Sequence, residues 1–272
     1  MKFEIIDTFP KGSLVEFSYK FQFEEEDLPF QWVMVPRGIS HFYYVFSDKY
    51  IQIIRDNTKT CIHNLIVQGP NYVGFKVLIE QPTVIIGVAL APTALYKLTG
   101  KSTHQLLNSF VPLHQYNTTI ATFIEPIFLK YYNDKSEFSQ QIYKRISNLK
   151  CSGKTRTGDV EKALALIHSS KGIIAIDDIC EALNLTRRSL NYNFKNMVGM
   201  TVGKYIRRYR FSRLVFDSKG QHIDFNELMS TFNYYDQSHF VKDFKFFTLQ
   251  NPSKYFNRDF EFISKFMPEN IL

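Results

Sequence analysis

Cysteine and tryptophan are both scarce in this chain of 272 residues, which contains three cysteines and one tryptophan. Cys61, Cys151 and Cys180 lie far apart, and no Cys-x-x-Cys pair occurs. An odd number of widely spaced cysteines argues against a disulfide framework and a cysteine zinc site. It is typical of proteins in a reducing compartment.

Membrane-spanning and export segments are also missing from the sequence. The apolar stretch at residues 81–96 is too short to cross a bilayer and contains Pro82 and Pro92. The N-terminal residues MKFEIIDTFPKG include acidic side chains where a signal peptide requires an apolar core. We therefore expect a soluble, cytoplasmic protein that has no membrane partner.

Common catalytic and metal-binding motifs are absent as well. The sequence has no His-x-His or His-Glu-x-x-His pair, no phosphate-binding glycine loop and no Gly-x-Ser-x-Gly nucleophile elbow. We predict no enzymatic activity, metal site or cofactor. The alternative is an enzyme with a metal-dependent, cupin-like N-terminal domain, which a bound transition metal would favour. An RNA-binding module lacks support, because no exposed aromatic pattern of the RNP type is present.

Positive charge is concentrated in the second half of the chain, whose formal net charge as a whole is +7. Residues 1–143 contain 12 Lys/Arg and 13 Asp/Glu, a net charge of −1, whereas residues 144–272 contain 21 and 13, a net charge of +8. Such asymmetry indicates a polyanionic partner for the basic half, with a solvated basic surface as the simpler alternative.

The first half is predicted to be rich in β-strands. Short β-branched and aromatic segments at residues 12–23, 41–55, 64–69, 72–79 and 83–90 are separated by Gly, Pro, Asn or Asp. This spacing favours a cupin-like barrel or sandwich. Helices expected at residues 118–134 and 136–150 would close a first domain, residues 1–150. The polar segment CSGKTRTGD, residues 151–159, has the character of a linker.

The second half is predicted to be all-helical, so that the fold class is α+β. Apolar periodicity and capping residues indicate helices at residues 160–170, 175–185, 187–197, 201–220, 224–232, 236–247 and 252–260. Thr186 and Asp236 are expected to cap the third and sixth of these helices. Gly220 is expected to end the fourth helix, and Pro252 to begin the last.

An internal repeat organises this second half. A shift of 50 residues aligns Leu190 with Phe240, Phe194 with Phe244, Lys195 with Lys245, Lys204 with Lys254 and Tyr205 with Tyr255. Each copy has the outline of a helix-turn-helix, with Asn184 and Asn233 in turns that require left-handed backbone conformation. The alternative is a plain helical bundle with an accidental likeness between its parts.

Two stretches resemble a known family. YYDQSHFVKDFKFFTLQNPSKYF, residues 234–256, is similar to the C-terminal signature of the AraC/XylS transcription regulators. LNLTRRSLNYNFKNMVGMTVGKYIRRYRFSRL, residues 183–214, resembles the family's first helix-turn-helix unit and linker helix. Met229 and Asn233 depart from the family pattern, which has a small residue and a glycine there.

This resemblance implies a particular fold and function. An AraC-type DNA-binding domain, residues 160–272, would have seven helices, and its two recognition helices would enter successive major grooves about 34 Å apart. The chain would be a sequence-specific transcription regulator that binds double-stranded DNA and contacts RNA polymerase. The N-terminal domain would bind a small-molecule effector and form a homodimer.

Outward-facing residues of the two expected recognition helices are the candidates for reading bases. In the first unit Arg188 suits guanine, Asn191 suits adenine, and Tyr192 suits a thymine methyl group or a sugar. In the second unit Gln237 suits adenine, Lys242 suits guanine, and Ser238 suits either base. The apolar stripe Phe240, Phe244 and Phe247 should be buried behind them.

Other basic residues are predicted to contact the DNA backbone, namely Arg187, Lys195, Lys245, Arg207, Arg208 and Arg210. Residues 144–219 hold 16 Lys/Arg and six Asp/Glu, whereas residues 220–272 have a net charge of −2. The first unit and the linker helix should therefore supply most of the electrostatic attraction. For an effector inside the barrel the candidates are Trp32, Arg37, His41, Tyr43 and Tyr44, with ordinary core packing as the alternative.

Overall fold

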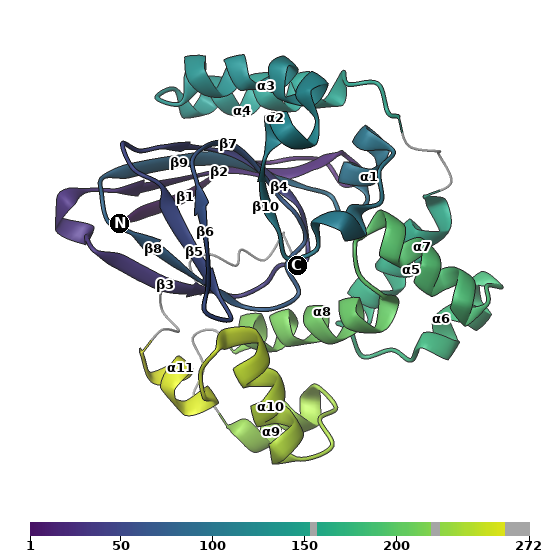
Figure 1. The fold of residues 1–272 in the computed structure, drawn as a ribbon. Helices are drawn as coiled ribbons and strands as arrows, with labels where there is room; N and C mark the ends of the chain where they lie inside the picture. The colour runs from purple at the N-terminus through teal and green to yellow at the C-terminus, as the bar shows by residue number, and fades with distance from the viewer. Residues whose placement is uncertain (153–156, 219–223, 259–272) are drawn as a thin grey trace.

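The computed structural model of the chain describes residues 1–152, 157–218 and 224–258. Its N-terminal region is rich in strands and its C-terminal region is helical, as predicted (Figure 1). Gly220, which we expected to end a helix, lies outside the described residues.

Two antiparallel sheets form the N-terminal region. In the larger sheet the strand order is β1 (Lys2–Thr8), β2 (Val15–Phe23), β9 (Thr83–Leu90), β4 (His41–Phe46), β7 (Asn64–Gln68) and β10 (Phe110–Pro112). In the smaller sheet it is β3 (Phe30–Met34), β8 (Phe75–Ile79), β5 (Ile51–Arg55) and β6 (Thr58–Ile62). The two sheets enclose one hydrophobic core, which includes Phe17, Tyr43, Ile53 and Phe75.

The alternation of side chains along β4 explains how this region is layered. Successive residues of a strand point to opposite faces of the sheet. Tyr43 and Val45 belong to the core between the sheets, whereas Phe42 and Tyr44 pack in a second core on the outer face. That outer face is covered by helices, so both faces of the larger sheet are apolar.

Two helices, α3 (Thr118–Tyr131) and α4 (Lys135–Ser147), lie across the outer face of the larger sheet (Figure 1). Ile124 and Phe128 of α3 and Phe138 of α4 are fully buried in the core that these helices share with the sheet. The short helices α1 (Ala94–Thr99), η2 (Thr103–Leu106) and α2 (Leu113–Tyr116) precede this pair. Both of the predicted closing helices are therefore confirmed.

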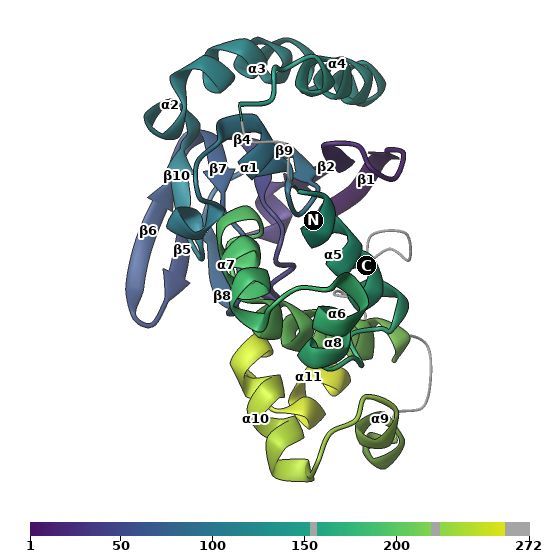
Figure 2. The same ribbon diagram turned by 90° about the vertical axis from the view of Figure 1, so that its right-hand side faces the viewer.

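The described part of the C-terminal region contains the seven helices that the family resemblance implied. They are α5 (Gly158–Ser169), α6 (Ile176–Leu183), α7 (Arg187–Met197), α8 (Val202–Asp217), α9 (Phe225–Thr231), α10 (Gln237–Thr248) and α11 (Pro252–Arg258). The pairs α6–α7 and α9–α10 are the two helix-turn-helix units, and α8 joins them. Figure 2 shows α9–α11 at the end of the molecule opposite to α3 and α4.

Local backbone chemistry sets the geometry of both units. Asn184 and Asn233 have φ values of 51° and 53°, so both turns use the left-handed conformation that we predicted. Thr186 accepts a hydrogen bond from the backbone N–H of Ser189, and Asp236 accepts one from His239. These caps begin α7 and α10 at the residues that the sequence predicted.

Some boundaries differ from the sequence prediction. The strands β1, β3, β6 and β10 were not predicted, and α5 begins at Gly158, inside the expected linker. Strand β6 reads TKTCI and has only Ile62 buried, so it lacks the alternation that marks a strand. A turn holds it against β5, with Asp56 and Asn57 both at positive φ, as a tight β-hairpin requires.

Candidate nucleic-acid interface and internal cavity

Helix α7 presents a polar, basic face on the first unit. Arg188, Tyr192 and Lys195 are all exposed, and 69% of the Tyr192 side chain is accessible to solvent. Their spacing of four and three residues places them on one side of the helix. Leu190 and Phe194 are fully buried on the other side. Arg187 is exposed and lies 3.5 Å from Asp177, which makes it a surface ion pair.

Asn191 is hydrogen-bonded within the protein in this conformation. Its Oδ1 accepts a hydrogen bond from the backbone N–H of Val202 at 3.3 Å, and its Nδ2 donates to the carbonyl of Arg187 at 3.1 Å. A bidentate contact with adenine needs both of these groups. In this conformation Asn191 instead helps to cap the first turn of α8, a role that the sequence repeat did not reveal.

Helix α10 presents a second exposed face. Gln237, Ser238, Lys242 and Lys245 are all exposed there, as predicted from the sequence. Tyr235 precedes this helix and is 93% exposed, yet the sequence analysis missed it. Its neighbour in the aromatic run, Tyr234, is buried, and composition alone does not distinguish the two. The geometry of the turn is what points Tyr234 inward and Tyr235 outward.

The stripe behind this face is buried as expected. Phe240, Phe244 and Phe247 are at most 2% exposed. The Phe244 ring packs 5.1 Å from Phe211 of α8 and 5.1 Å from Tyr255 of α11, measured between ring centroids. The aromatic residues of α10 therefore join the second unit to the helix that connects the two units.

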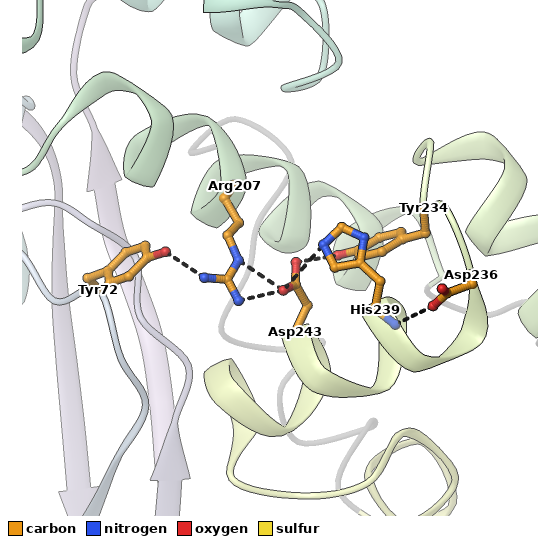
Figure 3. A network of polar contacts seen from close by, with 6 residues as sticks. All are labelled: Tyr72, Arg207, Tyr234, Asp236, His239 and Asp243. Atoms are coloured by element: carbon orange, nitrogen blue, oxygen red, sulfur yellow. Dashed lines mark hydrogen bonds and ion pairs between the residues drawn. The ribbon is translucent and has the colours of Figure 1, made fainter.

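The three α8 arginines that were predicted to contact the DNA backbone have partners within the protein. Arg207 forms an ion pair with Asp243, and Arg210 lies over the ring of Tyr234 at 4.9 Å (Figure 3 shows the first contact). Arg208 is only 3% exposed, so the predicted backbone contact is not possible for it in this conformation. Its guanidinium packs over the Tyr205 ring at 4.6 Å.

The N-terminal region anchors the first unit through main-chain atoms. Thr103 donates a hydrogen bond to the carbonyl of Met197 at 3.2 Å, and His104 donates one to the carbonyl of Gly199 at 2.8 Å. An added Cβ at Gly199 would lie 2.6 Å from Pro70, so the two surfaces are in close contact. The end of α7 is thereby fixed against η2.

A cavity of about 140 Å³ lies between the two sheets. Its lining is mainly aromatic and aliphatic, and it includes four of the five predicted effector residues: Trp32, Arg37, His41 and Tyr43. Tyr44 does not line it. Adjacent residues of a strand face opposite ways, so Tyr44 points to the helical layer, where its hydroxyl bonds with Asn64.

The polar groups of the cavity are few and buried. Burial lowers the pKa of Arg37 to about 10, and the guanidinium remains charged at neutral pH. Burial and the nearby Arg37 lower the pKa of His41 to about 3, so its imidazole is neutral there. The Nη2 atom of Arg37 and the Nδ1 atom of His41 have no hydrogen-bond partner among the described residues.

No group of three or more His, Cys, Asp or Glu side chains among the described residues is arranged to hold a metal ion. No helix in the part of the chain that the structure describes is long and apolar enough to cross a membrane.

A family model described as a helix-turn-helix domain matches residues 179–258. The matched range begins within α6 and ends with α11, so it contains both recognition helices. No curated protein matches the chain. The family match therefore coincides with the part of the structure that carries the two exposed polar faces.

Solved structures of two proteins are similar to this chain at low sequence identity. ToxT from Vibrio cholerae is 12% identical, with a TM-score of 0.48 over 88% of this chain and 96% of that one. ToxT from V. cholerae strain SCE256 with a bound unsaturated fatty acid is 14% identical, with a TM-score of 0.44 over 88% and 92%. The AraC-like transcriptional activator CuxR is 17% identical, with a TM-score of 0.24 over 73% and 74%.

Proposed function

We propose that this chain is an AraC/XylS-type DNA-binding transcription regulator in which α7 and α10 read two half-sites in successive major grooves. The observation that supports this proposal is the pair of exposed polar faces, each on a helix that follows a left-handed turn and a capping side chain. In helix-turn-helix proteins the second helix of each unit lies in the major groove.

The proposed roles of individual residues follow from exposure and hydrogen-bonding capacity. Arg188 and Lys242 would donate to guanine, Gln237 would pair with adenine, and Ser238 would bind either base. Tyr192 would contact a thymine methyl group or a sugar. Exposed cations beside these faces, Arg187, Lys195 and Lys245, would bind phosphates and fix the register without reading sequence.

Selection from a pool of random duplex DNA tests this reading. We expect one enriched site with two short blocks of sequence about 10–10.5 base pairs apart, centre to centre. Replacing Lys242 by alanine should remove preference within one block and leave the other intact. The matched control is Lys254→Ala, an exposed lysine of α11. A pool with no enriched sequence, or with a single block, would contradict two-site reading.

We also propose that the cavity holds an effector, a small and mostly apolar carboxylic acid. An engineered apolar cavity of about 150 Å³ in another protein accommodates benzene, so about 140 Å³ suits a ring or a short chain. The unpaired Nη2 atom of the charged Arg37 can bind a carboxylate, and the neutral His41 can bond with its second oxygen. Aromatic walls suit the apolar part.

Calorimetric titration with benzoate and hexanoate tests the effector site. Replacing Arg37 by methionine should weaken binding of either acid by about tenfold or more, because a charge-assisted hydrogen bond contributes about 1.5–3 kcal/mol. Lys59→Met, which removes an exposed cation from β6, is the control and should leave affinity unchanged. Equal affinity in both variants would place the acids elsewhere on the protein.

Other parts of the proposal concern organisation and context. Residues 1–150 would be the sensory and dimerising domain, residues 151–159 a linker, and residues 160–272 the DNA-binding domain. The outer face of α3, where Leu129 is 49% exposed, is available for a homodimer contact. The regulator would act in the cytoplasm, without catalysis, and would contact RNA polymerase at its promoters.

A further inference from the structure

A loop of the N-terminal region inserts a side chain into the second unit. Residues 69–74 connect β7 to β8, and Tyr72 in this loop is 6% exposed. Its hydroxyl accepts a hydrogen bond from Nη1 of Arg207 at 3.0 Å. Its ring packs against Phe246 and Phe247 of α10, with ring centroids 5.2 and 5.7 Å away.

Arg207 also bonds with α10 and so connects Tyr72 to that helix (Figure 3). Its Nε and Nη2 atoms donate to Oδ1 of Asp243 at 2.9 and 2.6 Å. The side chain of Asp243 is 1% exposed, and its Oδ2 accepts a further bond from the Tyr234 hydroxyl at 3.3 Å. Burying a carboxylate is energetically costly unless it is paired with a cation and hydrogen-bonded. The position of Arg207 therefore constrains that of α10.

These contacts fall on the back of α10 and leave its exposed face open. Successive helical residues are about 100° apart. By that measure Gln237, Ser238 and Lys242 cluster on one side, whereas Asp243 and Phe247 point roughly the opposite way. Phe246, which Tyr72 also contacts, lies between them, beside Lys242. The loop therefore orients the recognition helix and does not cover the face proposed to read DNA.

The main chains of the loop and of α10 also touch directly. A Cβ added at Gly74 would lie 2.5 Å from the carbonyl oxygen of Phe247. No side chain separates the two backbones at this point. A displacement of the loop would therefore directly displace the end of α10.

Residues on either side of Tyr72 are part of the cavity wall. Asn71 and Phe75 line the cavity, and Phe110 lines it beside them. Arg55 lies over the Phe75 ring at 5.4 Å and donates to Oδ1 of Asn71 at 2.7 Å. Asn108 accepts a bond from the backbone N–H of Tyr72 at 2.7 Å. Asn71 and Phe75, which line the cavity, are therefore connected through this loop to Tyr72, which contacts the second unit.

We propose that loop 69–74 couples the cavity to the orientation of α10, with Tyr72 as a positioning residue that acts through Arg207 and Asp243. This inference rests on the proposed two-site reading of DNA. A group that displaces Phe75 or Asn71 moves Tyr72 with them, and Arg207 and α10 follow. Pro70 of the same loop contacts Gly199 at the end of the first unit. The hydrogen bonds from Tyr72 through Arg207 to Asp243 lead to α10, so we expect the larger change at the second half-site.

Tyr72→Phe removes only the hydroxyl and isolates its role in the full-length chain. We expect about three- to tenfold weaker binding to the selected duplex, as for one lost hydrogen bond. Binding should be unchanged on a duplex whose second half-site has been scrambled. Tyr50→Phe, at a tyrosine of the N-terminal region that is 65% exposed, is the control. A loss of equal size on every duplex would show that Tyr72 is merely structural.

A change in the cavity wall tests the other end of the link. Phe75→Leu should alter affinity for the second half-site severalfold. Phe23→Leu makes the same change on β2, at a cavity residue distant in sequence from the loop, and should alter it less than twofold. Both phenylalanines are buried, 4% and 3% exposed, so their stability losses should be comparable in urea unfolding.

The double variant Phe75→Leu/Tyr72→Phe decides whether the route runs through Tyr72. We expect the effect of Phe75→Leu on the second half-site to disappear in the Tyr72→Phe background. Additive effects of the two substitutions would overturn the proposed route. Failure to select any two-block site would instead refute two-site reading itself, so the two failures are distinguishable.

Discussion

Alanine in place of Phe244 should unfold the second helix-turn-helix unit while the N-terminal sheets remain folded. Phe244 is 0% exposed, and its ring contacts Phe240 of the same helix, Phe211 of α8, and Tyr255 and Phe256 of α11. Truncating a buried phenylalanine to alanine costs about 3–5 kcal/mol. That is a large part of the roughly 5–15 kcal/mol that stabilises a typical domain.

Urea unfolding followed by far-UV circular dichroism measures this loss, and binding to the two half-sites locates it. The variant should keep preference in the first half-site and lose it in the second. Lys245→Ala changes the adjacent exposed position and should alter the free energy of unfolding by less than about 0.5 kcal/mol. A loss below about 1 kcal/mol for Phe244→Ala would mean that the aromatic stripe does not hold this unit together.

Arg188→Ala should reduce affinity for the selected duplex by about 1–3 kcal/mol and abolish preference at a single base pair. The guanidinium of Arg188 is exposed on α7, and its bidentate geometry matches the two acceptors of guanine. Alanine removes both hydrogen bonds, so guanine loses its advantage over the other bases at that position.

The neighbouring Arg187→Ala provides a matched comparison. Arg187 is proposed to bind phosphate, so its removal should weaken binding to every duplex equally. The slope of log affinity against log salt concentration should then fall by about 0.9. Affinities of both variants, measured on a panel of single-base changes at several salt concentrations, distinguish the two roles. Uniform weakening by Arg188→Ala would reassign that residue to the DNA backbone.

Local sequence chemistry predicted the helix-turn-helix units well. Caps and left-handed turns depend on residues a few positions apart, which is why Thr186, Asp236, Asn184 and Asn233 were identified correctly. The repeat also aligns Gly199 with Leu249. Both have positive φ, 94° and 57°, although leucine disfavours that conformation and gave no signal in the sequence.

Long-range partners could not be predicted. The α8 arginines were assigned to phosphates because the helix is basic, but Arg207 bonds with Tyr72, 135 residues away, and Arg208 packs on Gly38. Tyr44 was grouped with Tyr43 by composition, whereas strand alternation separates them. Asn191 was assigned to adenine because it was expected to face outward on α7, whereas its Oδ1 accepts a hydrogen bond from the backbone N–H of Val202, 11 residues later in the chain.

The joint between η2 and the first unit has a consequence for redesign. Thr103 and His104 bind carbonyl oxygens of Met197 and Gly199, and a carbonyl is the same whatever side chain the residue carries. Exchanging Arg188 or Tyr192 to address a new operator leaves those acceptors in place. A version with new residues at these exposed positions should therefore keep the contact between the N-terminal region and the first unit, and should differ only in the DNA sequence that it is proposed to bind.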